Sequence, residues 1–82
     1  MINLDPELHQ LRSIGRTLPP RESRDFESAR YHLYAAITAN RGDAWRWVDA
    51  MDTALRSYVE DDVLRANGMR ALAAIRDAIN AA

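Results

Sequence analysis

The sequence predicts an all-α fold, a small helical bundle of three long helices plus a short N-terminal helix, in a single domain over residues 1–82. Apolar residues recur at three- and four-residue steps in four segments, which is the spacing of one helical face. Short runs rich in glycine, proline and capping residues separate the first three segments. The fourth segment begins where the apolar phase of the third is lost.

The longest amphipathic segment runs over residues 43–60. Charged residues occupy the side opposite the apolar face, so the segment reads as a helix that packs on a core. The apolar phase fails at Asp62, and we therefore expect the helix to break near Glu60–Asp61, with Asp61 or Asp62 capping the next helix. The residues on its apolar face are Ala44, Trp47, Val48, Met51, Leu55, Tyr58 and Val59.

A short first helix is expected over about residues 6–14. Asp5 is its predicted N-cap, Pro6 suits the first helical position, and Gly15 is the predicted C-terminal stop. Isolated helices of this length are marginal in water, so this one must dock on the rest of the chain.

The second helix is expected from about Pro20 to Asn40, after a rigid connector that contains Pro19. Gly42 would supply a left-handed residue at its end, and Asp43 would cap the third helix. Such a short turn predicts an antiparallel hairpin of the second and third helices. The apolar residues of the second helix are Phe26, Ala29, Leu33, Ala36 and Ile37.

The fourth helix has two interpretations. Asn67-Gly68 is a typical turn sequence that would split the segment. The apolar phase nevertheless survives across Gly68, which favours one continuous helix in which Gly68 permits a close approach of a neighbouring helix. The residues that share this face are Leu64, Gly68, Ala71, Leu72, Ile75, Ala78 and Ile79.

Composition excludes several classes of protein. The formal net charge of −1 argues against a dedicated polyanion binder. The absence of cysteine excludes disulfides and thiolate metal sites. No apolar run is long enough to span a membrane and no secretion signal is evident, so we expect a cytoplasmic protein.

No catalytic, cofactor or metal site is expected. The two histidines, His9 and His32, lie in different predicted helices and outside any metal-ligand motif. Asp25, Ser28 and His32 follow one another at one-turn intervals, but an exposed helical face offers no pocket and no oxyanion donors. The sequence therefore predicts a protein that is not an enzyme.

Two surfaces are candidates for binding another protein. Tyr31 and Trp45 lie off the apolar faces near the predicted turn, beside Arg41 and Arg46, and exposed aromatic residues with arginines are typical of binding hot spots. Alternatively, the N-terminal helix simply covers both aromatic rings. The second candidate is an acidic surface on the third helix formed by Asp49, Asp52 and Glu60, which pairing of Arg56 with Asp52 and Glu60 would explain equally well.

These features favour a non-enzymatic protein-binding module, an adaptor or inhibitor of a larger host protein, of the type that phages and plasmids carry as small accessory proteins. The alternative is a small helical transcriptional regulator that contacts DNA phosphates through arginines, with an affinity that falls steeply with salt. Glu22 and Asp25 interrupt that basic strip, which makes DNA the weaker hypothesis. Its arginines are Arg12, Arg16, Arg21 and Arg24.

A homodimer is also expected, because so small a domain is only marginally stable alone. Met69 and Ala73 form a weakly apolar flank on the fourth helix that a twofold contact would use. In the rival account the N-terminal helix packs over that flank and completes a monomeric core. A mass near 9.3 kDa in solution would contradict the dimer.

Overall fold

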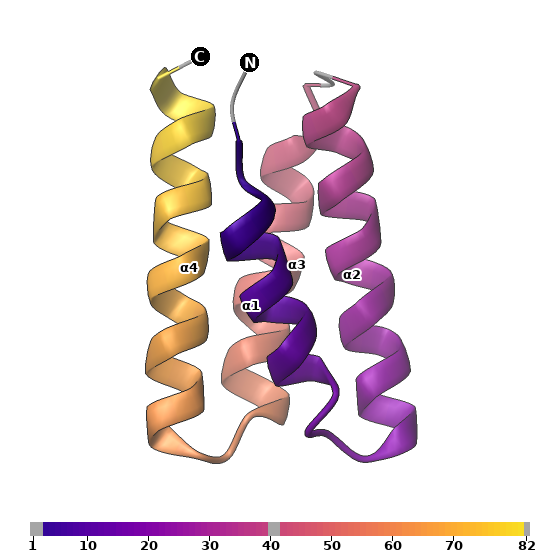
Figure 1. The fold of residues 1–82 in the computed structure, drawn as a ribbon. Coiled ribbons are helices and arrows are strands. Elements are labelled where there is room, and N and C mark those ends of the chain that lie inside the picture. Colours follow the sequence, from indigo (N-terminus) through magenta and orange to yellow (C-terminus); the bar gives the residue numbers. More distant parts are fainter. Residues whose placement is uncertain (1–2, 40–41, 82) are drawn as a thin grey trace.

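Four helices account for most of the chain in the computed structural model, which describes residues 3–39 and 42–81 (Figure 1). No strand occurs among these residues. This confirms the all-α class. The helices are α1 (Asp5–Gly15), α2 (Pro20–Thr38), α3 (Ala44–Tyr58) and α4 (Asp62–Ala81), with 11, 19, 15 and 20 residues.

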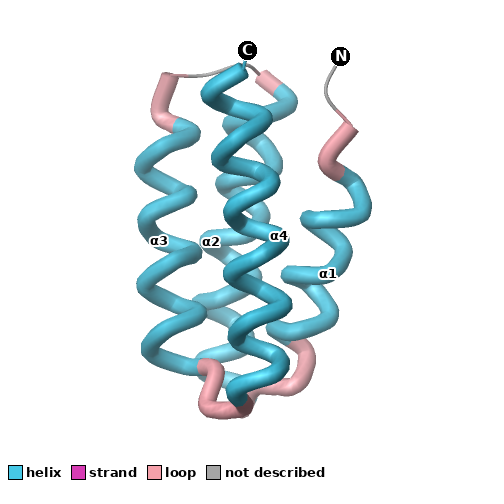
Figure 2. The backbone as a smooth tube through the Cα atoms, turned by 90° about the vertical axis from the view of Figure 1, so that its left-hand side faces the viewer, coloured by secondary structure: helices cyan, strands magenta, loops and turns pink. Residues whose placement is uncertain are grey.

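The helices form a closed bundle in which each packs against the next in sequence and α4 returns to α1. Consecutive helices run in opposite directions, so that both ends of the chain lie at the same end of the molecule (Figures 1 and 2). The predicted antiparallel arrangement of α2 and α3 is therefore confirmed. Asn40 and Arg41, in the turn that joins these two helices, lie outside the described residues.

Buried apolar side chains from all four helices meet in one core. The periodic positions predicted from the sequence fill this core or pack against it. Those that are only partly buried are Ala29, Ile37, Trp47, Tyr58, Leu64, Ala78 and Ile79. The apolar side of α1 contributes as fully as the longer helices do, which explains why a helix too short to be stable alone is formed here. The largest fully buried side chains are Leu11, Phe26, Leu33, Val48, Met51, Leu55, Leu72 and Ile75.

The start of α1 differs from the prediction. Asp5 is the first helical residue and Leu4 occupies the N-cap position, where no side chain caps the helix. The backbone N–H of Leu8 donates to the carbonyl oxygen of Leu4 at 3.0 Å, and the Leu4 side chain is buried in the core. Burial of Leu4 thus draws the helix start back by one residue, and the prediction that Asp5 is the N-cap was wrong.

Two glycines mark places where helices approach too closely for a larger residue. Gly15 is the last residue of α1, where the sequence predicts the end of this helix, and a Cβ atom there would lie 2.7 Å from Cδ1 of Phe26. At Gly68 such an atom would lie 2.5 Å from Cδ2 of Leu55 and 3.1 Å from Cδ1 of Ile14. The continuous helix through Gly68 is confirmed, and the glycine lets α4 pack on α3 and α1 together.

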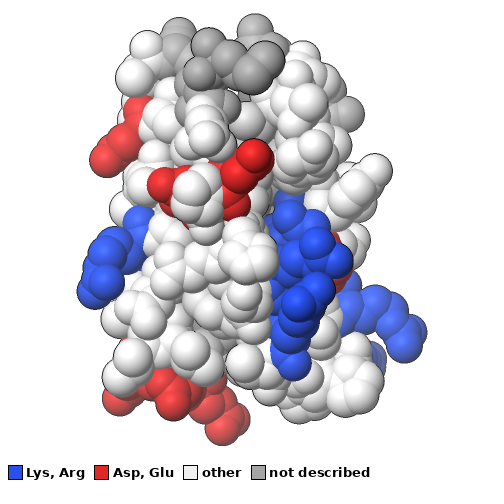
Figure 3. All heavy atoms as spheres, viewed as in Figure 1, with Lys and Arg blue, Asp and Glu red and all other residues white. Residues whose placement is uncertain are grey.

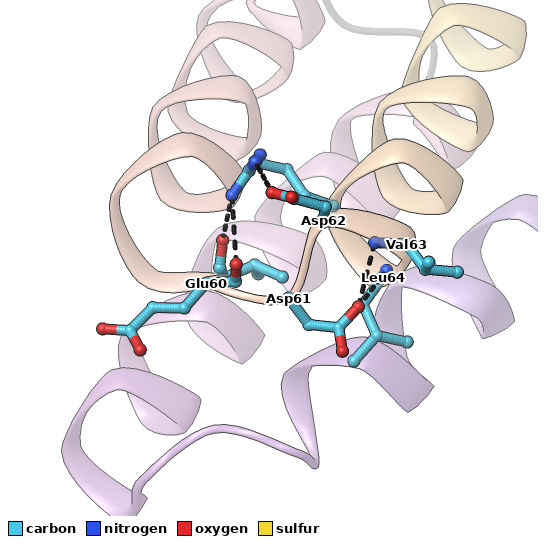
Figure 4. A network of polar contacts seen from close by, with 7 residues as sticks. Glu60, Asp61, Asp62, Val63 and Leu64 are labelled. Atoms are coloured by element: carbon cyan, nitrogen blue, oxygen red, sulfur yellow. Dashed lines mark hydrogen bonds and ion pairs between the residues drawn. The ribbon is translucent and has the colours of Figure 1, made fainter.

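The α3–α4 connection confirms the predicted helix break (Figure 4). Oδ1 of Asp61 accepts the backbone N–H groups of Val63 and Leu64 at 2.9 and 3.0 Å, which is the bonding of a helix N-cap. Arg65 donates to the carbonyl oxygen of Val59 at 2.9 Å and forms an ion pair with Asp62. The side chain of Arg65 therefore ties the start of α4 to the end of α3.

The flank of α4 proposed for a homodimer is divided between core and surface. Met69 is partly buried and packs against the hydrophobic core, whereas Ala73 is exposed. α1 does pack on α4, with Ile14 approaching Gly68. A twofold contact through α4 would therefore have to use its exposed side, which includes Ala73, and not the side centred on Met69.

Candidate protein-interaction surface

An aromatic row crosses from α2 to α3 on the outside of the bundle. The imidazole of His32 stacks on the indole of Trp47, with ring centroids 4.3 Å apart and an interplanar angle of 20°. Tyr31 meets His32 edge-on, with ring centroids 6.1 Å apart and an interplanar angle of 86°. The guanidinium carbon of Arg46 lies 5.5 Å from the Trp47 ring centroid. We refer to Tyr31, His32, Trp47 and Arg46 as the aromatic row.

The row is held in place by its own contacts and by the backbone of α2. Nδ1 of His32 lies 2.7 Å from the backbone oxygen of Ser28, one turn earlier, which fixes the orientation of the imidazole ring. Aromatic pairs of this kind contribute about 0.5–1.5 kcal/mol each, and an exposed cation–π contact about 0.5–1 kcal/mol. Tyr31 is nevertheless 59% exposed, so an ordered aromatic surface faces solvent.

Trp47 is the residue that joins the row to the core. Its side chain is partly buried, and its indole nitrogen is fully buried with no hydrogen-bond partner among the described residues. An unpaired buried donor costs about 1–3 kcal/mol. The unpaired indole nitrogen of Trp47 therefore destabilises the fold where the aromatic row meets the α2–α3 interface.

The structure separates the residues that the sequence grouped as one binding surface. Tyr31 and Arg46 both belong to the aromatic row. Trp45 does not, because it lies two residues before Trp47 and hence about 200° around α3. It is 38% exposed, and it makes no ring contact among the described residues. Arg41 lies outside the described residues.

The N-terminal helix does not cover these rings. α1 packs against α2 and α4, whereas the row lies where α2 meets α3. Tyr31 and Trp45 both remain exposed. The alternative in which α1 shields the two aromatic side chains is therefore wrong.

His32 and Trp47 are the members of the surface that the sequence interpretation missed. Trp47 is in phase with the apolar face of α3, which predicts a core position, but it stands at the edge of that face and is only partly buried. The only signal for His32 was its position next to Tyr31, and no periodicity reveals a stacking partner on another helix.

A shallow groove of about 350 Å³ continues from Trp47 along the α2–α3 seam. Small side chains form much of its surface, and at its far end the hydroxyl of Tyr58 donates to Oδ2 of Asp25 at 3.4 Å. The aromatic row therefore stands beside a concave strip that a partner's side chains can enter. The groove is lined by Asp25, Ser28, Ala29, Trp47, Ala50, Thr53, Ala54, Ser57 and Tyr58.

Asp25, Ser28 and His32 do not form a hydrogen-bonded chain of side chains. The imidazole nitrogen of His32 approaches the backbone oxygen of Ser28, and the hydrogen bond of Asp25 goes to Tyr58. Activation of a serine nucleophile needs a direct contact between its hydroxyl and a base. In this structure His32 instead serves as the stacking partner of Trp47.

The predicted acidic surface does not form one strip. Asp49 is exposed on α3, whereas Asp52 is partly buried and pairs with Arg56 at 3.1 Å. Because α3 ends at Tyr58, Glu60 lies in the connection to α4 and not on the helical face. The expected pairing of Arg56 with Glu60 was therefore wrong, since it required the helix to continue.

Within the described ranges, no group of three or more histidine or acidic side chains is arranged to hold a metal ion. None of the described helices is both long and apolar enough to cross a membrane. Comparisons with protein-family models, curated protein sequences and solved structures give no match.

Proposed function

We propose that this protein is a non-enzymatic protein-binding module, an adaptor or inhibitor of a larger protein, and that the aromatic row is its contact surface. The observation that carries the proposal is the exposed stack of Tyr31, His32 and Trp47 with Arg46 beside it. Tyrosine, tryptophan and arginine are the residues most enriched among binding hot spots.

The stacking makes this surface suited to binding. Ordering a rotamer-rich side chain at an interface costs about 0.5–1.5 kcal/mol, and contacts within the row already restrict its members. The adjoining groove adds concave surface with small side chains along the α2–α3 seam. A partner therefore meets a largely preformed site, with the aromatic row next to a shallow depression.

The second candidate, a DNA-binding regulator, is supported by Arg12 of α1 and by Arg16 directly after this helix, which are both exposed. DNA binding is the weaker hypothesis, because the carboxylate of Glu27 lies close enough to both arginines for their charges to lower its pKa. Arg24 of α2 likewise shares its outer surface with Glu27. A phosphate backbone following these arginines would pass over a carboxylate, which opposes the electrostatic term that drives non-specific DNA binding.

Affinity capture from extracts of the native host tests the proposal. We expect the tagged chain to retain one protein in stoichiometric amount, and a Tyr31→Ala/Arg46→Ala variant to lose it, because two hot spots of about 2 kcal/mol each together lower the affinity about 1,000-fold. The measurement is quantitative mass spectrometry of the captured protein.

The matched control is Val63→Ala/Arg70→Ala, which removes an exposed apolar side chain and an arginine from α4, away from the row. It should retain the partner as the unmodified chain does. Equal retention by the Tyr31→Ala/Arg46→Ala variant, with helicity unchanged by circular dichroism, would refute the proposed surface.

A further inference from the structure

A second surface lies over α1 and α2, where the space-filling view shows a group of basic side chains (Figure 3). Arg12 belongs to α1 and Arg30 to α2, and Arg16 directly follows α1, with its backbone N–H bonded to the carbonyl oxygen of Arg12 at 3.1 Å. We call these three residues the arginine patch. It lies on the opposite flank of α2 from α3, since α1 and α3 pack on different sides of that helix.

One carboxylate is embedded in the arginine patch. Nε and Nη2 of Arg30 donate to the two carboxylate oxygens of Glu27 at 2.8 and 2.6 Å. This bidentate bond, followed by the charges of Arg30, Arg12 and Arg16, holds the pKa of Glu27 below its ordinary value of 4.5 against the opposing effect of burial. Because the charges of Arg12 and Arg16 act on Glu27, these three groups and Arg30 lie close together.

The charges of the arginine patch are not balanced within the chain. Glu27 is engaged by Arg30, whose side chain is only 12% exposed. Arg12 and Arg16 are exposed and form no ion pair with any described residue. Two guanidinium groups one helical turn apart are therefore free to receive carboxylates from outside.

We propose that the arginine patch binds an acidic helical segment of the partner protein, in which two carboxylates one turn apart pair with Arg12 and Arg16. Residues four apart on a helix lie about 5–6 Å from each other, so such a segment presents carboxylates at the spacing of the two arginines. The guanidinium fork matches a carboxylate in bidentate geometry. Tyr34, 42% exposed and one turn beyond Arg30, adds an aromatic ring at the edge.

The surroundings favour a short acidic segment over a nucleic acid. Acidic surface lies both above and below the arginine patch in the same view (Figure 3). Asp5 and Glu7 lie in the first turn of α1, and three further acids, Glu60, Asp61 and Asp62, lie in the α3–α4 connection and at the start of α4. A nucleic acid would bring successive phosphates against these carboxylates, whereas a segment with two carboxylates stays within the patch.

This inference rests on the proposed protein-binding function, but it concerns a different flank of α2, so that the two can fail separately. The test measures fluorescence anisotropy of a labelled alanine-based helical peptide with two glutamates one turn apart, at low ionic strength. A glutamine version of the peptide and a duplex DNA oligonucleotide are measured in parallel. We expect binding of the glutamate peptide alone.

Three variants define the contact. Arg12→Ala/Arg16→Ala should weaken peptide binding about tenfold, the sum of two exposed charge pairs. The matched control Arg56→Ala/Arg70→Ala removes two exposed arginines from α3 and α4 and should leave the affinity unchanged. Glu27→Gln removes the competing carboxylate and frees Arg30, so it should tighten binding about threefold.

Two results with the unmodified protein would overturn the inference: no binding of the glutamate peptide, or an affinity for DNA as high as that for the peptide. Two results with the variants would also overturn it. These are an equal loss of peptide affinity in the two double variants, or a lower peptide affinity in Glu27→Gln. Loss of host-partner capture in Tyr31→Ala/Arg46→Ala with unchanged peptide binding would support both proposals as separate surfaces. Peptide binding as expected, in a chain that captures no host protein, would refute the proposed function while upholding the chemistry of the patch.

Discussion

Phe26→Ala is expected to lower the free energy of unfolding by about 3–5 kcal/mol. Phe26 is fully buried and has the largest side chain of the core. It packs on Gly15, where no side chain exists to move into the vacated space. A chain of 82 residues has a total stability of only about 4–12 kcal/mol, so the variant should lose a large share of its stability.

Urea denaturation followed by circular dichroism measures the effect. Tyr34→Ala is the control, because it removes an aromatic ring that is 42% exposed from the same helix and should cost far less. Gly15→Ala offers a second check: its added methyl group should destabilise the parent, where it would lie 2.7 Å from the Phe26 ring, and stabilise Phe26→Ala by filling the cavity. Equal effects of Gly15→Ala in both backgrounds would contradict this account of the contact.

Gly68→Val should lower the unfolding free energy by roughly 3 kcal/mol. The first added carbon would lie 2.5 Å from Cδ2 of Leu55, a side chain with no exposed surface into which it can move. The helix preference of valine over glycine, at most about 0.5 kcal/mol, cannot offset such overpacking. For a domain of this size the loss corresponds to a fall in the melting temperature of more than roughly 10 °C.

The matched control is Ala66→Val on the same helix, at an exposed position. There a β-branched side chain costs only its helix propensity, about 0.5–0.7 kcal/mol relative to alanine. Differential scanning calorimetry of both variants measures the difference. A melting temperature of Gly68→Val equal to that of Ala66→Val would show that the three-helix junction has room that the structure does not show.

The helical segments could be predicted because their apolar phase is long and unbroken. The unbroken apolar phase correctly predicts that α4 continues through Gly68, although Asn67-Gly68 is a strong local turn signal. It also located the break at Glu60–Asp61, where Asp61 caps the next helix. The start of α1 was placed one residue late because capping preferences suggested Asp5, whereas burial of Leu4 in the core decided the boundary.

The surface was less predictable because it depends on pairs of helices. Periodicity assigns each residue to a side of its own helix, and it separated Tyr31 from the core of α2 correctly. It could not show that His32 of α2 stacks on Trp47 of α3, or that Trp45 points elsewhere, because both depend on how the two helices pack. The position of Glu60 depended on α3 ending at Tyr58.

The most direct test of the proposed function is site-specific photo-crosslinking in the native host. A photoreactive phenylalanine analogue replaces Tyr31 in the aromatic row, and in a parallel strain it replaces Ala66 on the outer side of α4. The account predicts a covalent adduct with one discrete host protein from position 31 and none from position 66. No adduct at position 31, or the same adducts at both positions, would contradict it.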